Sequence, residues 1–297
     1  MPKIALGTAQ IGLNYGIHNK SGKPSEAEAF SILNTAYDNG IEVLDTAYAY
    51  GDSEERIGQY INSTKRNFKI CTKLPHIPNQ KNVSYYINES LKRLSKTKID
   101  FYLLHNISQV NNKKIIDDLF RFKKDGSIDK IGVSVYDVND VEIVLEKGIF
   151  DCIQIPMNIF DRRLLKSGHL EKIKNQNLEI FIRSIFLQGL FFLELNKINE
   201  VLSVWDRYAC PLQSYLKSLN DFSHEFNTSI QDLILGWFKY NEYGNYIIIG
   251  VETNAQLQNN LDSFNKEVDN EIINKFNQFV NTIEISDDSI IIDPRRW

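Results

Sequence analysis

The sequence is poor in cysteine, with three residues in 297, and the three are far apart: Cys71, Cys152 and Cys210. An odd number of widely spaced cysteines predicts neither a disulfide framework nor a zinc site, and we expect no metal. Reduced cysteines are typical of cytoplasmic proteins, so the cytoplasm is the expected location.

Long apolar runs and basic clusters are also missing. No run approaches the roughly 20 apolar residues that a membrane-spanning helix requires. Met1–Thr8 lacks the organisation of a signal peptide and resembles a strand instead. The formal net charge is −4, with no dense patch of Lys and Arg, which argues against a nucleic-acid surface. We expect neither a membrane nor a nucleic acid as a partner, and the oligomeric state is not indicated.

What the sequence does contain is an alternation of strand-like and helix-like segments. Hydrophobic residues make up 42% of the chain, enough for a large core. The predicted strands are Lys3–Thr8, Ile41–Asp45, Phe68–Lys73, Ile99–His105, Ile128–Val135, Asp151–Ile155, Leu178–Arg183 and Tyr246–Gly250. Between and after them we expect helices at Ser25–Asn39, Ser53–Ile61, Val83–Ser95, Ile115–Asp125, Val138–Lys147, Leu164–Asn177, Ile198–Tyr240, Asn254–Phe264 and Glu271–Thr282.

Eight strand–helix alternations over this length favour a closed (β/α)₈ TIM barrel, within the α/β class, with an extra C-terminal helix. Continuous apolar strands indicate parallel pairing with both faces of the sheet buried. The alternative is an open doubly wound sheet, but the G-x-G-x-x-G turn that such a sheet often carries is missing. No linker divides the chain, so one domain over residues 1–297 is predicted.

Four polar residues follow consecutive apolar runs: Asp45, Tyr50, Lys73 and His105. Residues at the strand C-termini of a parallel barrel meet at one rim, where active sites lie. A tyrosine ionises near pH ~10, and the Lys73 ammonium is expected to lower the pKa of Tyr50. Asp45 would hold Lys73, and His105 would bond the same carbonyl oxygen. The four together would stabilise a developing alkoxide, with hydride coming from a cofactor.

The segment Asp45–Glu54 resembles the signature of the aldo-keto reductases, NAD(P)-dependent oxidoreductases built on a (β/α)₈ barrel. The family's Asp, Tyr, Lys and His tetrad maps onto Asp45, Tyr50, Lys73 and His105, and Leu6–Thr8 and Ile249–Val251 also match in place. The resemblance implies NAD(P)H-dependent reduction of an aldehyde or ketone to the alcohol, with Tyr50 as the proton donor.

The same resemblance implies where the cofactor binds. Ser134 and Gln154 match residues that contact the nicotinamide carboxamide, although Val135 replaces the usual Asn. Arg183 stands where many relatives place a stacking Tyr. The implied cofactor-binding residues are Gly7, Thr8, Asp45, Ser134, Gln154, Arg183, Ser184, Leu187, Gln188, Gly189, Gly250, Glu252, Gln256 and Asn260.

Cofactor preference stays open between NADP(H) and NAD(H). NADPH-preferring relatives carry basic residues where this chain has Glu252 and Gln256. An acid there repels a 2′-phosphate and can bond a ribose 2′-hydroxyl. For the small-molecule carbonyl substrate, Tyr15, Tyr48, His76 and Asn106 are the expected contacts, and they suit a sugar-like compound.

Two other functions remain open. The family resemblance allows a non-catalytic, nicotinamide-nucleotide-binding regulatory subunit, and Val135 and Arg183 depart from the usual pattern. Lys73 could also serve as the amine of a Schiff base in a lyase or isomerase, but only if it were neutral.

Overall fold

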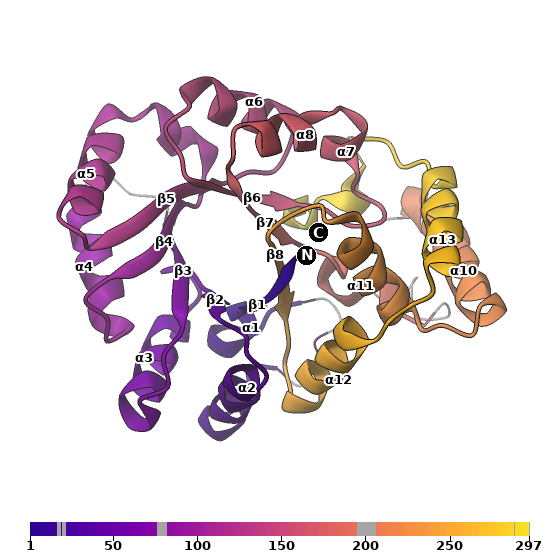
Figure 1. Cartoon of the computed structure of the whole chain (residues 1–297), viewed down its shortest axis with the longest axis horizontal. Coiled ribbons are helices and arrows are strands. Elements are labelled where there is room, and N and C mark those ends of the chain that lie inside the picture. Colours follow the sequence, from indigo (N-terminus) through magenta and orange to yellow (C-terminus); the bar gives the residue numbers. More distant parts are fainter. Residues whose placement is uncertain (17–18, 20–21, 76–81, 195–205, 288, 297) are drawn as a thin grey trace.

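A closed barrel of eight parallel strands forms the centre of the molecule (Figure 1), with each strand beside its sequence neighbours and β8 beside β1. The computed structural model describes the chain except residues 17–18, 20–21, 76–81, 195–205, 288 and 297. The strands are β1 (Lys3–Gly7), β2 (Val43–Asp45), β3 (Lys69–Leu74), β4 (Ile99–Leu104), β5 (Ile128–Ser134), β6 (Cys152–Pro156), β7 (Glu179–Arg183) and β8 (Tyr246–Gly250). The predicted (β/α)₈ barrel is confirmed.

Helices surround the barrel, and most occupy the positions predicted between the strands. They are α1 (Ala9–Gly12), α2 (Glu26–Asp38), α3 (Ser53–Thr64), α4 (Val83–Arg93), α5 (Lys113–Lys124), α6 (Val138–Lys147), α7 (Arg163–Lys166), α8 (His169–Asn175), α10 (Asp206–Glu225), α11 (Ile230–Asn241), α12 (Asn254–Asn265) and α13 (Asn270–Thr282). Short 3₁₀ turns are η1 (Ile107–Asn111), η2 (Leu187–Phe192), η4 (Ile290–Ile292) and η5 (Pro294–Arg296). Helix α13 is the expected extra C-terminal helix, and it packs on α10 through Phe276 and Phe222.

Two predicted helices are each two helices in the structure. The segment Leu164–Asn177 divides into α7 and α8 at Gly168, which has φ of +73°. The segment Ile198–Tyr240 divides into α10 and α11 near Asn227, which has φ of +44°, and its residues 198–205 lie outside the described part of the chain. Left-handed residues end a helix because the next N–H no longer points along the axis.

The barrel interior changes from apolar to polar along each strand. Interior side chains recur every second residue. The interior side chains nearer the N-terminal ends of the strands form an apolar barrel-interior cluster of Ala5, Val43, Cys71, Phe101, Leu103, Cys152, Phe181, Tyr246 and Ile248. Two residues further along, the interior positions are Gly7, Asp45, Lys73, His105, Ser134, Gln154, Arg183 and Gly250. The polar side chains therefore collect at the C-terminal end of the barrel.

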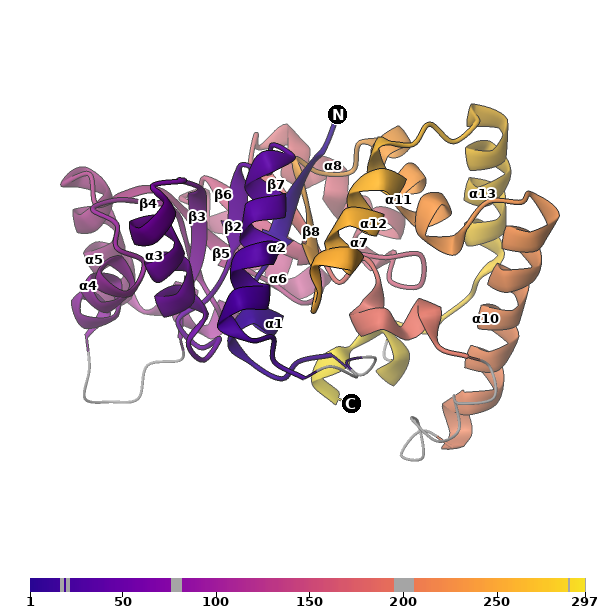
Figure 2. The same ribbon diagram turned by 90° about the horizontal axis from the view of Figure 1, so that it is seen from below.

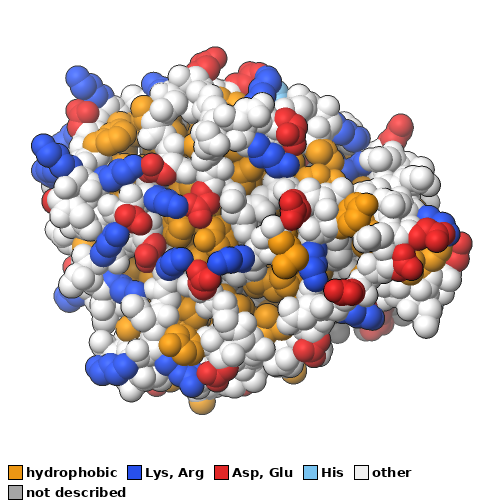
Figure 3. Space-filling view, in the orientation of Figure 1, with side chains coloured by type: hydrophobic (Ala, Val, Ile, Leu, Met, Phe, Trp, Pro, Cys, Tyr) orange, Lys and Arg blue, Asp and Glu red, His pale blue; other side chains and the backbone are white. Residues whose placement is uncertain are grey.

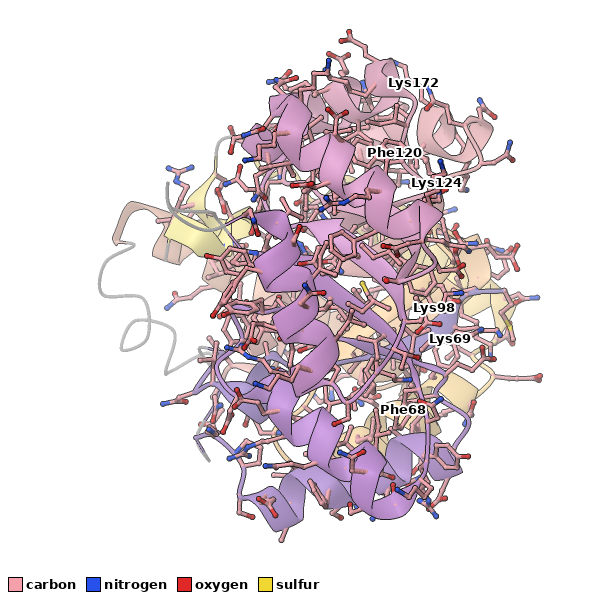
Figure 4. All side chains as sticks on the ribbon, turned by 90° about the vertical axis from the view of Figure 1, so that its left-hand side faces the viewer. Phe68, Lys69, Lys98, Phe120, Lys124 and Lys172 are labelled. Atoms are coloured by element: carbon pink, nitrogen blue, oxygen red, sulfur yellow. The ribbon has the colours of Figure 1, made fainter. Side chains whose placement is uncertain are left out.

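The other end of the barrel carries interspersed positive and negative side chains (Figure 3). Glu42 bonds both Lys3 and Lys69, and Lys98 bonds Asp129. Lys69 and Lys98 lie near each other in Figure 4, and Phe120 lies exposed on α5. Exposed pairs of this kind contribute at most about 1 kcal/mol each.

Within the described residues, no helix is both long and apolar enough to cross a membrane.

Candidate active site

A cavity of about 390 Å³ opens at the C-terminal ends of the strands, which lie at the bottom of Figure 2, where β1 runs down from the N-terminus. That volume falls in the range of small-molecule sites. All the predicted cofactor-binding residues line it: Gly7, Thr8, Asp45, Ser134, Gln154, Arg183, Ser184, Leu187, Gln188, Gly189, Gly250, Glu252, Gln256 and Asn260. The cavity runs from the end of β2 to the first turns of α12.

The four predicted catalytic side chains meet at one end of this cavity. Asp45, Tyr50 and His105 line it, and Lys73 lies beneath them with no exposed surface. Lys73 Nζ donates to Asp45 Oδ1 and to the Thr46 carbonyl, both at 2.8 Å. It also lies 5.2 Å from the centre of the Tyr50 ring. The Tyr50 and His105 rings meet edge to face at 5.9 Å. One substrate oxygen could therefore approach both rings.

Tight packing fixes the turn that carries Tyr50. Gly51 has φ of +56°, and helix α1 presses against the turn so closely that a Cβ at Gly12 would lie 1.9 Å from the Tyr50 carbonyl oxygen. The Ser53 hydroxyl bonds Thr8 Oγ1 at 2.9 Å and accepts from Thr46 Oγ1 at 3.0 Å. These buried bonds tie the end of β1 to the start of α3, and they hold the Tyr50 turn between the two.

Burial and neighbouring charges act in opposite directions on the pKa of Lys73, and also on the pKa of Tyr50. Burial lowers the pKa of Lys73, but Asp45, Tyr50 and Cys71 more than offset this, and the net pKa lies above its ordinary value. Lys73 is therefore protonated. Burial raises the pKa of Tyr50 to about 12, and the Lys73 charge offsets only part of that rise. Lys73 thus lowers the pKa of Tyr50, as predicted, but burial has the larger effect, so the net pKa lies above its ordinary value and not below it.

His105 is neutral at physiological pH. Burial and the Lys73 charge lower its pKa to about 4, and Asp45 opposes them. A neutral imidazole carries one N–H donor and one acceptor nitrogen. The ring can therefore donate a hydrogen bond without adding a second positive charge beside Lys73.

Two buried polar side chains continue the site across the barrel. Gln154 Nε2 donates to Asp45 Oδ1 at 2.8 Å, and the Ser134 hydroxyl lies 3.4 Å from Gln154 Oε1. Because Asp45 fixes the amide orientation, Gln154 presents its oxygen as an acceptor. A carboxamide N–H₂ matches that acceptor, and Ser134 can bond the carboxamide oxygen.

The loop after β7 is strained where it lines the cavity. Ser184, Leu187 and Gln188 have φ of 63°, 48° and 55°, followed by Gly189 at 85°. Non-glycine residues rarely adopt such angles, and they cluster at ligand-binding sites. The Leu187 and Gly189 N–H groups bond the Ser184 and Phe186 carbonyls. These bonds hold the loop in place, and they occupy two N–H groups that could otherwise bind a pyrophosphate.

Arg183 is a cation in the cavity wall. Its Nη2 donates to the Val135 carbonyl at 3.0 Å, and its guanidinium carbon lies 4.3 Å from the centre of the Tyr136 ring. Tyr136 was missed from the sequence, although its place just after β5 is a strand-end position like the others. Phe192, Gln231, Ile248 and Asn259 also line the cavity and were not predicted; all but Gln231 lie on elements that also carry predicted residues.

The predicted substrate residues fall in different places. Tyr15 lines the cavity, and its hydroxyl accepts from Gln188 Nε2 at 3.2 Å. Tyr48 does not line the cavity: it packs edge to face on Tyr86, and the Arg93 guanidinium lies 4.1 Å from the centre of its ring. Asn106 caps η1 by accepting from the Ser108 N–H and is likewise not among the lining residues. His76 lies outside the described residues.

The cavity fits a nicotinamide cofactor. It offers amide-binding groups in Ser134 and Gln154, a cation in Arg183, and at its far end the amide of Asn260, whose Oδ1 accepts from Gln231 at 2.7 Å. Within the described part of the chain, no group of three or more His, Cys, Asp or Glu side chains is placed to hold a metal ion.

Comparisons with known proteins agree with this geometry. The model of the aldo/keto reductase family matches residues 3–281. Aldo-keto reductase YhdN of Bacillus subtilis is 26% identical over 182 residues, 56% of this chain and 53% of that protein. D-arabinose 1-dehydrogenase of Saccharomyces cerevisiae is 24% identical over 206 residues, 59% of this chain and 60% of that protein. The chain thus spans little more than half the length of these relatives.

Solved structures share the fold. The holo form of an aldo-keto reductase from Bacillus halodurans superposes with a TM-score of 0.75 at 17% identity, covering 96% of this chain and 94% of that one. An aldo-keto reductase from Klebsiella pneumoniae in complex with NADPH gives 0.70 at 18% identity, covering 99% and 95%. At such identities the likeness shows the fold alone.

Proposed function

Since the chain belongs to the aldo/keto reductase family, we propose that it is a nicotinamide-dependent oxidoreductase that reduces an aldehyde or ketone to the alcohol. The observation that carries this proposal is the buried Lys73–Asp45 ion pair beneath Tyr50 and His105, at one end of a cavity that continues to Asn260. A bound nicotinamide cofactor supplies the hydride.

The side chains supply the remaining chemistry. Tyr50 keeps its proton at neutral pH, as a general acid must, and it delivers the proton to the substrate oxygen. The protonated Lys73 stabilises the negative charge that develops on that oxygen and on Tyr50. Asp45 holds Lys73 in place and orients Gln154. Neutral His105 donates a hydrogen bond that orients the carbonyl.

The expected substrate is a sugar-like carbonyl compound. The cavity wall near Tyr50 combines aromatic and hydrogen-bonding groups in Tyr15, Tyr136 and Gln188, a mixture that suits several hydroxyl groups better than an aliphatic chain. A relative named D-arabinose 1-dehydrogenase supports this choice of substrate class. A panel of keto-sugars, aldoses and simple aldehydes, assayed with NADH and with NADPH, tests it. Faster turnover of the aliphatic aldehydes would contradict the proposal for the substrate.

The Tyr50→Phe variant tests the proton donor. Removal of the hydroxyl should lower kcat by roughly 100- to 10,000-fold, the usual contribution of general acid catalysis. The phenyl ring still fills the same space, so cofactor affinity, followed by the fluorescence of the reduced nicotinamide, should change little. Normal turnover in this variant would refute the role of Tyr50. Cofactor binding by the wild type without turnover of any carbonyl would instead indicate a regulatory subunit.

The state of Lys73 argues against a Schiff-base mechanism. An amine nucleophile must be neutral, whereas Asp45 keeps Lys73 protonated. Borohydride treatment in the presence of a carbonyl substrate should therefore leave Lys73 unmodified, and mass spectrometry of the digested protein measures this directly.

A further inference from the structure

The N-terminus of α12, at the far end of the cavity, is already occupied by the chain's own side chains. Thr253 Oγ1 accepts from the Gln256 N–H at 3.2 Å. Gln256 Oε1 accepts from the N–H groups of Glu252, at 2.7 Å, and Thr253, at 3.2 Å. Helix N-termini bind phosphate through free N–H groups, and three of the N–H groups at this end are taken.

A fourth N–H group is taken by a carboxylate from another element. Glu28, in the first turn of α2, accepts from the Asn254 N–H through Oε1 at 2.7 Å. Helices α2 and α12 lie side by side in both ribbon views (Figures 1 and 2). Glu28 therefore does at this helix end what a phosphate would do, and it places a negative charge there.

Glu252, two residues before Asn254, brings a second carboxylate to this helix end. Glu252 lines the cavity, and its Oε2 lies 3.5 Å from Gln256 Nε2. Among the described residues, Arg183 is the one Lys or Arg side chain that lines the cavity, and it bonds the Val135 carbonyl near β5. Glu252 thus lines this end of the cavity, Glu28 holds the Asn254 N–H beside it, and among the described residues no cation lines this end.

We propose that Glu28 and Glu252 select the cofactor: they exclude a 2′-phosphate, so that the chain binds NAD(H) in preference to NADP(H). The inference rests on the proposed function: with the nicotinamide bound at Ser134 and Gln154, the adenosine half of the cofactor would extend to Gln256 and Asn260 at the far end of the cavity. A phosphate monoester brings up to two negative charges. Here it would meet two carboxylates and N–H groups that are no longer free. A ribose 2′-hydroxyl can donate to Glu252 instead.

Fluorescence titration of the full chain with NADH and with NADPH tests the proposal. The wild type should bind NADH at least tenfold more tightly than NADPH. The double variant Glu28→Gln/Glu252→Gln removes both negative charges, and the amide oxygen introduced at position 28 can still accept from the Asn254 N–H. This variant should bind NADPH at least fivefold more tightly than the wild type does, and the ratio of NADPH affinity to NADH affinity should rise. The single variant Glu252→Gln should move in the same direction, which guards against misfolding of the double variant.

Competition by cofactor fragments isolates the adenosine end. ADP-ribose should displace NADH from the wild type more effectively than its 2′-phosphorylated form, and the double variant should reduce that difference. Glu26→Gln is the matched control: Glu26 lies in the same turn of α2 but is exposed, so its loss should leave the preference unchanged.

Different results would overturn the cofactor preference and the proposed reductase function. Equal affinity for the two cofactors, tighter binding of NADPH, or a double variant with the wild-type preference would overturn the role of the two acids and leave the proposed reductase intact. Binding of neither cofactor would overturn the proposed function and this inference together.

Discussion

At the scale of single residues, His105 should couple stability to pH. Its pKa is about 4 in the folded protein and about 6.5 when unfolded. Below pH 6.5 the unfolded chain therefore binds the proton that the folded chain does not, and stability falls until about pH 4. Between pH 7 and pH 5 this residue should cost about 2 kcal/mol of unfolding free energy. Urea unfolding at the two pH values measures the loss, and His105→Gln should reduce it by that amount.

The exposed His224 on α10 provides the comparison. His224→Gln makes the same substitution at an exposed site outside the cavity and serves as the matched control. If His105→Gln lost as much stability on acidification as the wild type, the imidazole would not be buried neutral beside Lys73.

The sequence predicts the positions of the catalytic residues better than it predicts their pKa values. Asp45, Lys73 and His105 follow apolar runs, and a two-residue period with parallel strands is enough to bring them to one rim. The pKa of Tyr50 depends on how completely the loops enclose it, and that is a property of packing. Tyr48 shows the same limit: its sequence position suits a substrate contact, but Arg93 and Tyr86 hold it elsewhere.

At the scale of elements, the contact between α1 and the Tyr50 turn should matter for turnover. Gly12→Ala places a methyl group 1.9 Å from the Tyr50 carbonyl oxygen, so the turn must move. Overpacking of this kind costs about 2 kcal/mol or more. We expect lower thermal stability and also a lower kcat in the molecules that remain folded, because Tyr50 moves with its turn. Thermal unfolding and steady-state kinetics measure the two effects.

Gly58→Ala is the matched control, since its Cβ would lie 1.9 Å from the Arg93 carbonyl oxygen, between α3 and α4. It should lose similar stability but retain the kcat of the wild type. Equal kcat in the two variants would show that α1 does not position Tyr50.

The elements themselves were predicted where their signals are strong. All eight strands were found because each is a short apolar run between polar turns, and β8 matches its predicted bounds. The divisions at Gly168 and Asn227 were missed because a single left-handed residue inside a long helical pattern is a weak signal. Helix α1 was missed because four residues do not establish a helical period.

At the scale of the whole molecule, the barrel separates stability from function along its axis. The apolar interior layer holds the ring pairs Phe101–Phe181 and Phe181–Tyr246, with centres 5.0 Å and 4.6 Å apart. The interior at the C-terminal end of the barrel holds the polar residues that line the cavity. In barrels of this kind the N-terminal end of the strands stabilises the fold and the C-terminal end carries the chemistry. A change in the apolar layer should therefore lower stability and spare cofactor binding, and a change at the C-terminal end should do the reverse.

Phe101→Ala and Ser134→Ala test this separation. Phe101 is 4% exposed and lies in the apolar layer, so its truncation should lower the unfolding free energy by about 3–5 kcal/mol. Its distance along β4 from His105 should leave the cofactor affinity of the folded protein unchanged. Ser134 makes one long hydrogen bond within the protein, so Ser134→Ala should cost less than about 1 kcal/mol of stability but weaken cofactor binding several-fold. Denaturant unfolding and cofactor titration on both variants give the four values. Loss of cofactor affinity in folded Phe101→Ala would mean that the two ends of the barrel are coupled, because the apolar layer would then also set the geometry of the groups above it.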